Sequence, residues 1–461
     1  MADTYLLKTF GSAGNRKKFT ISVWLKQVQG IKTSSNFVIF SAGSASNTYG
    51  QIRYKSGYIQ FEDEQGGSVK ATPYTNAHFV DPSAWYHLVV RVDTTQSTAA
   101  DRVRFYRNGS QLSATGTQPD QNEDLNMNNN IAHAIGTLYR GSDSGGHWNG
   151  HMAQFIFCDD QSYAPSSFAA TDANGIWAPN ASPSITYGSN GFRIDFKGTG
   201  ASADSSGFGA DTSGNNNHFA TTNIGTNPSS KDSPTNNFAV FNMQGSNASS
   251  ITEGGLRMVG DTGTSNSLGA CSSIAFQKGK WYAEFKVGTN DNNYIGLCKE
   301  GNMMSNTLDY QYQKGQLFYK TDGNKASGTG SGFGTNTSYG ASYTSGDIIG
   351  VAADMDNKKL YFSKNGTFQD SGDPTSGSTG TGAAFTSSQI SGQADSDIKA
   401  DTFYSFFSAG YNDGICQANF GNPSFTISSS NADANGYGSF EYAVPSGYYA
   451  LCTKNLAQYG G

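Results

Sequence analysis

The chain has 461 residues, 57 of them glycine, with 14% charged residues and a net charge of −6. This length predicts two or three domains that each bury a core, and 13% aromatic residues exclude a disordered chain. The acidic balance argues against nucleic-acid binding, which needs a basic face. No apolar run approaches the roughly 20 residues that span a bilayer, and Met1–Gly14 lacks the apolar stretch of a signal peptide. We therefore expect no membrane insertion and synthesis in a cytoplasm.

Short segments that alternate apolar and polar residues recur along the chain, with the period of a half-buried strand. They are Phe19–Leu25, Trp85–Val92, Val103–Tyr106, Met152–Phe157, Phe192–Phe196, Trp281–Val287, Ile348–Ala353 and Lys359–Phe362. Asn108-Gly109 and Asn365-Gly366 directly follow two such segments and predict tight hairpins, because both residue types tolerate positive φ. No window of ten or more residues carries a helical stripe, and Pro165–Ala170 forms at most one short turn. We therefore predict an all-β fold of two antiparallel β-sandwiches.

A change of composition separates the two sandwiches. Residues 198–250 are mostly Gly, Ser, Asn, Asp and Thr, and they are too poor in apolar residues for a core of their own. We predict a first sandwich over residues 1–197, a polar connector over 198–250, and a second sandwich with a C-terminal extension over 251–461. Spaced aromatic residues in the connector are anchors that can dock on neighbouring sheets, namely Phe208, Phe219, Phe238 and Phe241.

Four segments of the first half form a recognisable set: Phe19–Leu25 (FTISVWL), Trp85–Arg91 (WYHLVVR), Arg104–Gly109 (RFYRNG) and Gly150–Phe157 (GHMAQFIF). Together they resemble the laminin-G/concanavalin A-like lectin superfamily over about Tyr5 to Lys197. This resemblance implies a jelly roll in which the segments are sandwich strands. Lectin-like sandwiches of this kind often hold Ca²⁺.

A second set lies between about Gly254 and Leu456. It comprises Gly279–Val287 (GKWYAEFKV), Tyr294–Leu297 (YIGL), Gly346–Gly366 (GDIIGVAADMDNKKLYFSKNG) and Asn419–Phe425 (NFGNPSF). The set resembles a SPRY domain in residues, order and spacing. The resemblance implies a second antiparallel sandwich whose loops bind a partner.

Three flanking segments are more particular: Asp211–Phe219, Ser233–Phe241 and Pro445–Leu456. They resemble parts of virion proteins of marine tailed bacteriophages. This resemblance implies a virion surface protein that is assembled in the host cytoplasm, is oligomeric on the particle and contacts other capsid or tail proteins. The chain shows no tail-anchoring domain and no heptads of a coiled-coil shaft. A capsid decoration protein, a small spike subunit and an adaptor-mounted adhesin all remain open.

Metal-ligating residue types are scattered. His147 and His151 flank a short aromatic segment and, with Asp143, supply two or three ligands, although a loop rim explains them as well. Loop carboxylates are candidate Ca²⁺ ligands, because this hard cation takes several oxygens; they are Asp143, Asp159, Asp160, Asp354 and Asp356. Otherwise we expect no cofactor. The five cysteines are an odd count without a C-x-x-C pair, so we expect free, mostly buried thiols rather than disulfides or a zinc site.

Catalytic constellations are weak. Glu62-Asp63-Glu64 supplies carboxylates for glycoside cleavage, but the three residues are consecutive, precede Gly66-Gly67 and have the composition of a hairpin turn. Carboxylates that alternate along one strand, as in concanavalin-like glycosidases, are not evident. All six histidines lie in the first half or the connector, so the second half has no histidine base. We therefore expect a protein that is not an enzyme.

Binding by loops remains. Tyr, Ser, Gly and Asn dominate the expected turns, which is the composition of adaptable recognition surfaces. The candidate ligand-binding residues are Tyr139, Asp143, His147, Trp148, Tyr312, Tyr343, Tyr411, Asn412 and Asp413. For any one tyrosine, packing over a sheet edge explains its position equally well. We expect a non-enzymatic virion surface protein, either a capsid decoration or a tail-associated adhesin with weak glycan- or host-binding loops. The alternatives are a polysaccharide depolymerase and an intracellular SPRY peptide-binding adaptor.

Overall fold

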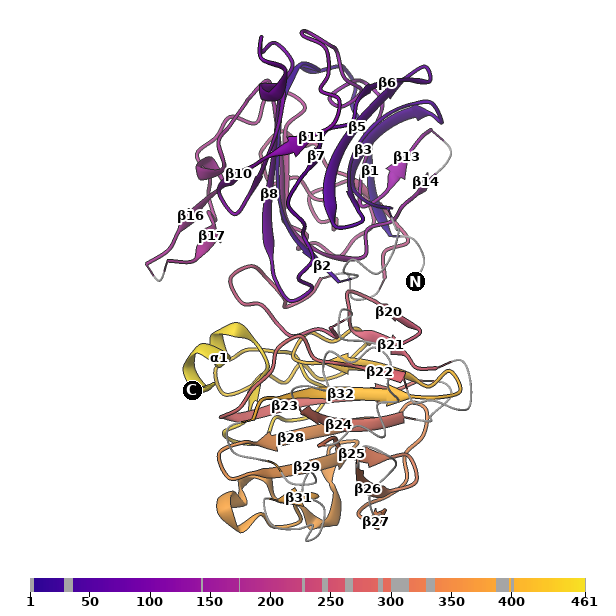
Figure 1. Cartoon of the computed structure of the whole chain (residues 1–461), viewed down its shortest axis with the longest axis vertical. Helices are drawn as coiled ribbons and strands as arrows, with labels where there is room; N and C mark the ends of the chain where they lie inside the picture. Colours follow the sequence, from indigo (N-terminus) through magenta and orange to yellow (C-terminus); the bar gives the residue numbers. More distant parts are fainter. Residues whose placement is uncertain are drawn as a thin grey trace. The chain divides into compact units, whose positions relative to one another are not determined.

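The chain folds into two compact units, Met1–Ser229 and Ser230–Gly461, and each is built almost wholly from strands (Figure 1). The structure is a computed structural model. It describes residues 4–28, 36–141, 144–173, 175–225, 229–242, 248–261, 268–288, 293–299, 315–328, 336–386, 398 and 402–460. Within these ranges the α-helical content is one short helix, α1 (Thr453–Tyr459). The predicted all-β class of antiparallel sandwiches is confirmed.

Unit 1 contains two large antiparallel sheets. Sheet 1 runs in the order β11-β7-β5-β4-β3-β12-β1-β19, with β6 beside β5. Its strands are β1 (Tyr5–Thr9), β3 (Asn36–Ala45), β4 (Thr48–Lys55), β5 (Tyr58–Gln65), β6 (Ser68–Ala71), β7 (Tyr74–Thr75), β11 (Ala114–Thr115), β12 (Ala132–Ile135) and β19 (Ala220–Thr222). Sheet 2 runs in the order β10-β9-β8-β2-β15-β18. Its strands are β2 (Lys18–Gln27), β8 (Tyr86–Asp93), β9 (Val103–Arg107), β10 (Ser110–Leu112), β15 (Gly150–Asp159) and β18 (Phe192–Ile194).

The core of unit 1 lies between these sheets and follows the alternation in the sequence. Phe19, Ile21, Val23 and Leu25 of β2 are all buried in it, as predicted. Phe192 stacks on Phe155 and Phe157 from β15 and meets the ring of Phe219 edge-on, with 4.7 Å between the two ring centroids. Two short hairpins flank the sandwich: β13 (Leu138–Tyr139) with β14 (Ser144–Gly145), and β16 (Ala169–Thr171) with β17 (Trp177–Pro179).

Unit 2 repeats the two-sheet plan. Sheet 3 contains β20 (Ser250–Thr252), β21 (Arg257–Val259), β33 (Ile415–Asn419), β23 (Lys280–Val287), β28 (Ile348–Asp354), β29 (Lys359–Lys364) and β30 (Thr367–Phe368), with β31 (Phe385–Thr386) on β29 and β34 (Tyr449–Ala450) on β23. Sheet 4 contains β22 (Leu268–Cys271), β32 (Tyr404–Gly410), β24 (Asn293–Lys299), β25 (Leu317–Lys320), β26 (Asn324–Ser327) and β27 (Thr337–Ser338). The pair β34·β23 is parallel, while the other described strand pairs of unit 2 are antiparallel.

Local signals in the sequence are confirmed at the turns. Asn108 and Asn365 take φ values of 48°, and the glycines that follow take 84° and 81°, at the hairpins β9–β10 and β29–β30. The expected short turn appears as a single 3₁₀ turn, η2 (Pro165–Ser167). All five cysteines are free and buried, as predicted. Among the described residues, no helix has the length and apolar character needed to span a membrane.

The polar segment 198–250 is divided between the units, because the boundary falls between Ser229 and Ser230. Its first part pairs β19 with β1 and buries Phe219 in unit 1. Its second part buries Phe238 and Phe241 in unit 2. Side chains in the first part hold the local fold: Asp211 accepts hydrogen bonds from the backbone amides of Arg193, Ser213 and Asn217.

Candidate functional site

The outer face of sheet 1 carries a cluster of polar side chains on β4 and β5. The register pairs Ile52 with Phe61, and both side chains point to the core. Because successive side chains of a strand point to opposite faces, the adjacent pairs point outward. These outer pairs are Tyr49 with Glu64, Gln51 with Glu62, and Arg53 with Gln60. We call these six residues the outer-face cluster. The prediction of a turn at 62–64 is wrong, because these residues continue β5 and the turn follows at Gly66-Gly67.

The cluster is fixed by its own hydrogen bonds. Glu62 Oε1 accepts from the Tyr49 hydroxyl at 3.0 Å, and Oε2 accepts from Gln51 Nε2 at 3.3 Å. Arg53 Nη2 lies 2.5 Å from Glu62 Oε2, and the same guanidinium donates to Gln60 Oε1 at 3.0 and 2.8 Å. These contacts hold several planar polar groups in one arrangement.

Burial within the cluster leaves one acceptor unused. Gln51 is 1% exposed, and its Oε1 atom has no hydrogen-bond partner within the described structure. Burial, together with the neighbouring Glu62 and Glu64 carboxylates, raises the pKa of Tyr49 well above its usual range. Tyr49 therefore stays a hydroxyl donor. The buried members of the cluster thus fix its half-buried members, which are the part that a ligand rich in hydroxyl groups can reach.

Tyr139 is the predicted site residue that the structure brings to this cluster. Its backbone amide donates to Ser41 Oγ at 3.1 Å, so β13 lies over β3. A Cβ at Gly43 would lie 2.3 Å from the Tyr139 carbonyl oxygen, so this close approach requires glycine. The residue after Tyr139 is Arg140, and its guanidinium group lies 5.9 Å from the centroid of the Tyr49 ring.

The other predicted residues of the first loop group have different surroundings. The His147 ring stacks on Tyr5 with 6.1 Å between centroids. Trp148 packs against the core, and its backbone amide donates to Gly136 O at 2.8 Å. Asp143 lies outside the described residues. The structure therefore uses His147 and Trp148 in packing at the edge of sheet 1.

In unit 2 the predicted residues also divide. Tyr343 is 3% exposed, and its hydroxyl lies 2.8 Å from Asn293 O and 3.0 Å from Tyr319 O, so it is part of the interior rather than of an open surface. Tyr411 is half-buried and stacks on Tyr294 at 6.2 Å between centroids. Asn412 and Asp413 form the turn between β32 and β33, with φ values of 51° and 59°. The predicted residue Tyr312 lies outside the described residues.

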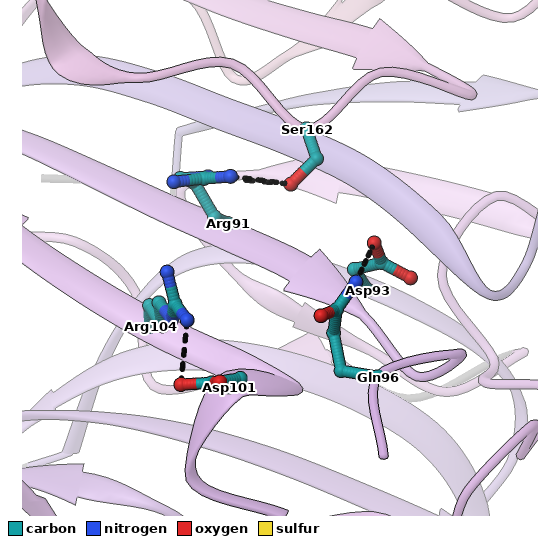
Figure 2. A pocket seen from close by; sticks show the side chains of 6 residues that line it. All are labelled: Arg91, Asp93, Gln96, Asp101, Arg104 and Ser162. Carbon is teal, nitrogen blue, oxygen red and sulfur yellow. Dashed lines mark hydrogen bonds and ion pairs between the residues drawn. The ribbon is translucent and has the colours of Figure 1, made fainter. Parts of the chain in front are cut away.

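Sequence analysis did not predict the pocket that lies on the outer face of sheet 2 (Figure 2). Arg91 and Arg104 are 13 positions apart, and only the pairing of β8 with β9 places them directly opposite each other. The pocket has a volume of about 60 Å³ and is lined by Arg91, Asp93, Gln96, Asp101, Arg104 and Ser162.

Ser22 and His87 lie together but have the wrong polarity for a nucleophile and its base. Trp177 Nε1 donates to His87 Nδ1 at 3.1 Å, which leaves the ring proton on Nε2, 2.8 Å from Ser22 Oγ. A histidine base would need a free lone pair facing that hydroxyl. Burial also lowers the pKa of His87 to about 3. This pair is therefore a structural contact.

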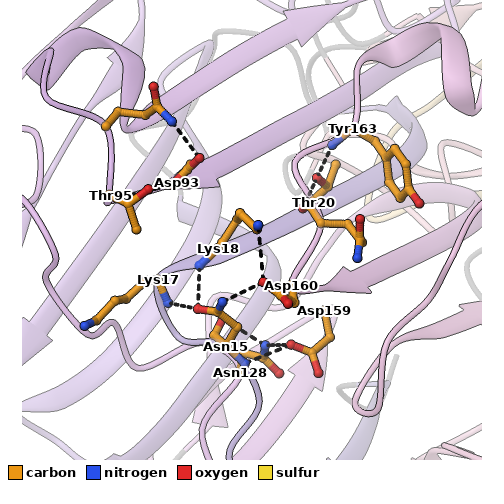
Figure 3. A network of polar contacts seen from close by, with 12 residues as sticks. Asn15, Lys17, Lys18, Thr20, Asp93, Thr95, Asn128, Asp159, Asp160 and Tyr163 are labelled. Carbon is orange, nitrogen blue, oxygen red and sulfur yellow. Dashed lines mark hydrogen bonds and ion pairs between the residues drawn. The ribbon is translucent and has the colours of Figure 1, made fainter.

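The loop carboxylates that the structure describes are engaged by nitrogen groups of the protein. Asp159 accepts from Asn15 N at 2.9 Å and from Asn128 Nδ2 at 2.5 Å (Figure 3), and also from Asn190 N at 3.2 Å. Ca²⁺ needs oxygen ligands, which these nitrogen donors are not. Asp160 contacts Lys18 Nζ at 3.4 Å.

The second group of loop carboxylates gives the same result. Asp354 pairs with Lys280 Nζ at 2.9 Å and accepts from Asn357 N at 2.9 Å. Throughout the described ranges, His, Cys, Asp and Glu form no group of three with the spacing of metal ligands.

The two sandwiches are also found by sequence comparison with family models. Residues 3–161 match the model of the Concanavalin A-like lectin/glucanases superfamily, and residues 280–423 match the SPRY domain model. The chain therefore contains a concanavalin A-like domain followed by a SPRY domain, which confirms both resemblances. A search of curated proteins gave no match.

Solved structures give low-level likenesses. A putative carbohydrate-binding protein from Bacteroides ovatus is 14% identical, covers 49% of this chain and 57% of its own, and has a TM-score of 0.32. Domains LG4-5 of mouse laminin alpha1 are 10% identical, with 88% and 81% covered and a TM-score of 0.28. The SPRY domain of human HERC1 is 16% identical, with 35% and 87% covered and a TM-score of 0.25.

Proposed function

We propose that this chain is a non-enzymatic glycan-binding protein and that the outer-face cluster of unit 1 contacts the glycan. The observation that carries this proposal is the row of half-buried polar side chains, Arg53, Gln60 and Glu64, which the buried members of the cluster hold in place. Sugar hydroxyls donate and accept at once, so they suit side chains such as Arg53, Gln60 and Glu64. Fixed side chains lose little conformational entropy when a ligand binds.

The biological setting that we propose is the surface of a tailed bacteriophage particle. The support is the resemblance of Asp211–Phe219, Ser233–Phe241 and Pro445–Leu456 to segments of such virion proteins. In this setting the partners are other capsid or tail proteins, the chain is oligomeric on the particle, and the glycan belongs to the host surface. Mass spectrometry and a cryo-EM map of purified particles test this setting, and absence of the chain from the particle would contradict it.

The proposal that the chain is not an enzyme rests on the position of the carboxylates. Glycoside cleavage by two carboxyl groups needs one of them protonated beside an ionised partner. Burial raises the pKa of Asp63 to about 6, but Asp63 points to the core side of β5. Glu62 and Glu64 share the outer face, and Glu62 is paired with Arg53.

One observation favours a second candidate, a polysaccharide depolymerase. Glu62 and Glu64 alternate along one strand and face the same side. Release of reducing ends from host polysaccharide, lost in Glu64→Gln, would establish that activity. Under our proposal, the full chain releases none at any pH between 5 and 8.

The glycan proposal is tested with the full chain on a glycan array. We expect wild type to bind at least one glycan and Gln60→Leu to bind it at least tenfold more weakly, because Leu keeps about the volume of this half-buried side chain but has no amide to exchange hydrogen bonds with sugar hydroxyls. Gln417→Leu, on β33 of unit 2, is the matched control and is expected to bind as wild type does. Absence of wild-type binding, or equal binding by Gln60→Leu, would overturn the proposal.

A further inference from the structure

The pocket on the outer face of sheet 2 contains two positively charged side chains that face each other on neighbouring strands. Arg91 of β8 and Arg104 of β9 form a directly opposed cross-strand pair. Like charges in such a pair destabilise a sheet. The arrangement therefore gains stability from any negative charge that binds between the two guanidinium groups.

Arg91 has only neutral partners. Its Nε and Nη2 atoms donate to Ser162 Oγ at 3.2 and 3.0 Å, and its Nη1 atom donates to the Tyr106 hydroxyl at 3.1 Å. Among the described residues, no carboxylate forms an ion pair with it. The charge of Arg91 is thus not neutralised by the protein.

Arg104 is only partly satisfied. Its Nη2 atom lies 2.5 Å from Asp101 Oδ1, while its Nε atom is buried and has no acceptor in the described part of the chain. A buried N–H without a partner destabilises the fold, and an acceptor that binds there removes this cost. Figure 2 shows both guanidinium groups on the same side of the pocket.

The second carboxylate of the pocket is already engaged by neutral donors. Asp93 Oδ1 accepts from the Thr95 amide at 3.2 Å and from the Thr95 hydroxyl at 2.5 Å, and Oδ2 accepts from Gln96 Nε2 at 2.7 Å. It stabilises the turn that follows β8. Asp93 is therefore bound to neighbours of its own turn, whereas Arg104 Nε has no acceptor in the described part of the chain.

We propose that this pocket binds one oxyanion, a carboxylate, sulfate or phosphate group, between Arg91 and Arg104. Guanidinium groups bind such anions with two parallel hydrogen bonds. The pocket, with a volume of about 60 Å³, has room for one such group. The group is either a free ion or the charged substituent of an acidic sugar. This site lies on the opposite sheet from the outer-face cluster and is independent of it.

Calorimetric titration of the full chain at constant ionic strength tests the proposal. The probes are inorganic sulfate, inorganic phosphate, acetate, glucuronate and glucose. We expect saturable binding of at least one anion, and binding at least tenfold weaker in Arg91→Gln and in Arg104→Gln. Arg257→Gln on β21 removes the same charge from unit 2 and is expected to bind as wild type does. A preference for glucuronate over acetate identifies a charged sugar, and equal binding identifies the free anion group.

The proposal would be overturned by the absence of saturable anion binding to wild type, or by binding in Arg91→Gln equal to that in wild type. Binding of glucose as tightly as glucuronate, with loss of both in Arg91→Gln, would also overturn it, because the pocket would then recognise hydroxyl groups. Arg91→Lys keeps the charge and loses the two parallel hydrogen bonds. It is expected to fold and to bind at least fivefold more weakly, and it tests the pocket if Arg91→Gln does not fold.

Discussion

The two units bury different titratable groups. Unit 1 buries His87, His133 and Asp63, whereas Glu284 of unit 2 is the buried carboxylate with a raised pKa. Burial lowers the pKa of His87 to about 3 and that of His133 to about 4, and it raises the pKa of Asp63 to about 6 and that of Glu284 to about 7. The same cause acts in opposite directions on bases and acids. Two sandwiches of similar plan should therefore respond differently to pH.

The two carboxylates also hold different kinds of partner. Glu284 accepts from the backbone amides of Glu441 and Tyr442 at 2.9 and 2.8 Å and from Asn419 Nδ2 at 3.1 Å. It thereby attaches the C-terminal extension, which lies beyond the SPRY match, to β23.

Asp63 holds its partners largely through side chains. It accepts from one backbone amide, that of Asn126 at 2.8 Å, and from the side-chain amides of Asn126 and Gln65, each at 3.0 Å. Side-chain amides can turn to water when the carboxylate is removed, and backbone amides cannot. Removing Glu284 should therefore cost more than removing Asp63.

The largest expected effect is that of Glu284→Ala. It leaves two backbone amides without an acceptor, so we expect the free energy of unfolding of unit 2 to fall by about 4 kcal/mol. Asp63→Ala is the matched change in unit 1, with an expected loss of about 2 kcal/mol. Denaturation followed by hydrogen exchange of peptides from each unit measures both. Equal losses would contradict the comparison.

Acidification should move the two units in opposite directions. Glu284 has a folded pKa of about 7, above its ordinary value of 4.5, so its contribution is complete at low pH and is lost as pH rises through about 7. His87 and His133 have lowered pKa values, so their contribution is present above about 6.5 and is lost as pH falls. Asp63 offsets part of this loss below pH 6.

When the pH falls from 7.5 to 5, we expect the free energy of unfolding to rise by about 3 kcal/mol in unit 2. In unit 1 we expect it to fall by about 3 kcal/mol. Denaturation at five pH values, resolved by unit, measures this. Glu284→Gln should flatten the slope of unit 2 alone. Parallel slopes in both units would refute the assignment of these groups.

A smaller effect is expected from single donors. Asn419→Ala removes one donor to Glu284 and also the contact to Ser439 O, so we expect a loss of about 1–2 kcal/mol in unit 2. The same substitution should raise the pKa of Glu284, because a hydrogen bond to the ionised form is lost. A shift of the pH slope of unit 2 to higher pH is the readout. An unchanged slope would show that Asn419 does not act on the carboxylate.

The smallest expected effect is that of Gln65→Ala. This side chain is half-buried and donates to Asp63 and to Asp124 O. Water can replace both contacts, so we expect at most about 0.5 kcal/mol. A loss as large as that in Asp63→Ala would mean that Gln65, rather than Asn126, holds the carboxylate.

Local patterns predicted much of the fold. The alternation in Phe19–Leu25 and the Asn-Gly pairs depend on neighbours in sequence, and both predictions are confirmed. Glu62-Asp63-Glu64 misled because a charged triplet before two glycines has the composition of a turn. The strand continues there because Glu62 and Glu64 pair with Gln51 and Tyr49 of the neighbouring strand β4. Asp63, on the opposite face, is buried and accepts a hydrogen bond from Asn126. Such pairing is set by distant strands and is not visible in a local window.

The candidate sites were harder to predict for the same reason. Arg91 and Arg104 meet only through the register of β8 and β9. Tyr139 reaches the outer-face cluster because β13 crosses β3 over Gly43. Loop composition led us to predict Tyr343 as a surface residue, but the fold buries it. Composition cannot distinguish the two cases, because tyrosine occurs both in interiors and at binding surfaces.

The pairing of β19 with β1 has a consequence for the integrity of unit 1. The backbone of 220–222 covers the side of β1 that faces away from β12, and Thr4 Oγ1 adds a hydrogen bond to Asn223 O. A fragment that stopped at residue 197 would leave this side as a bare strand edge, open to pairing with another copy of itself. The three-residue strand β19 thus replaces the five-residue strand β1 as the edge of sheet 1, a shorter edge offers less to pair with, and the first unit extends to Ser229.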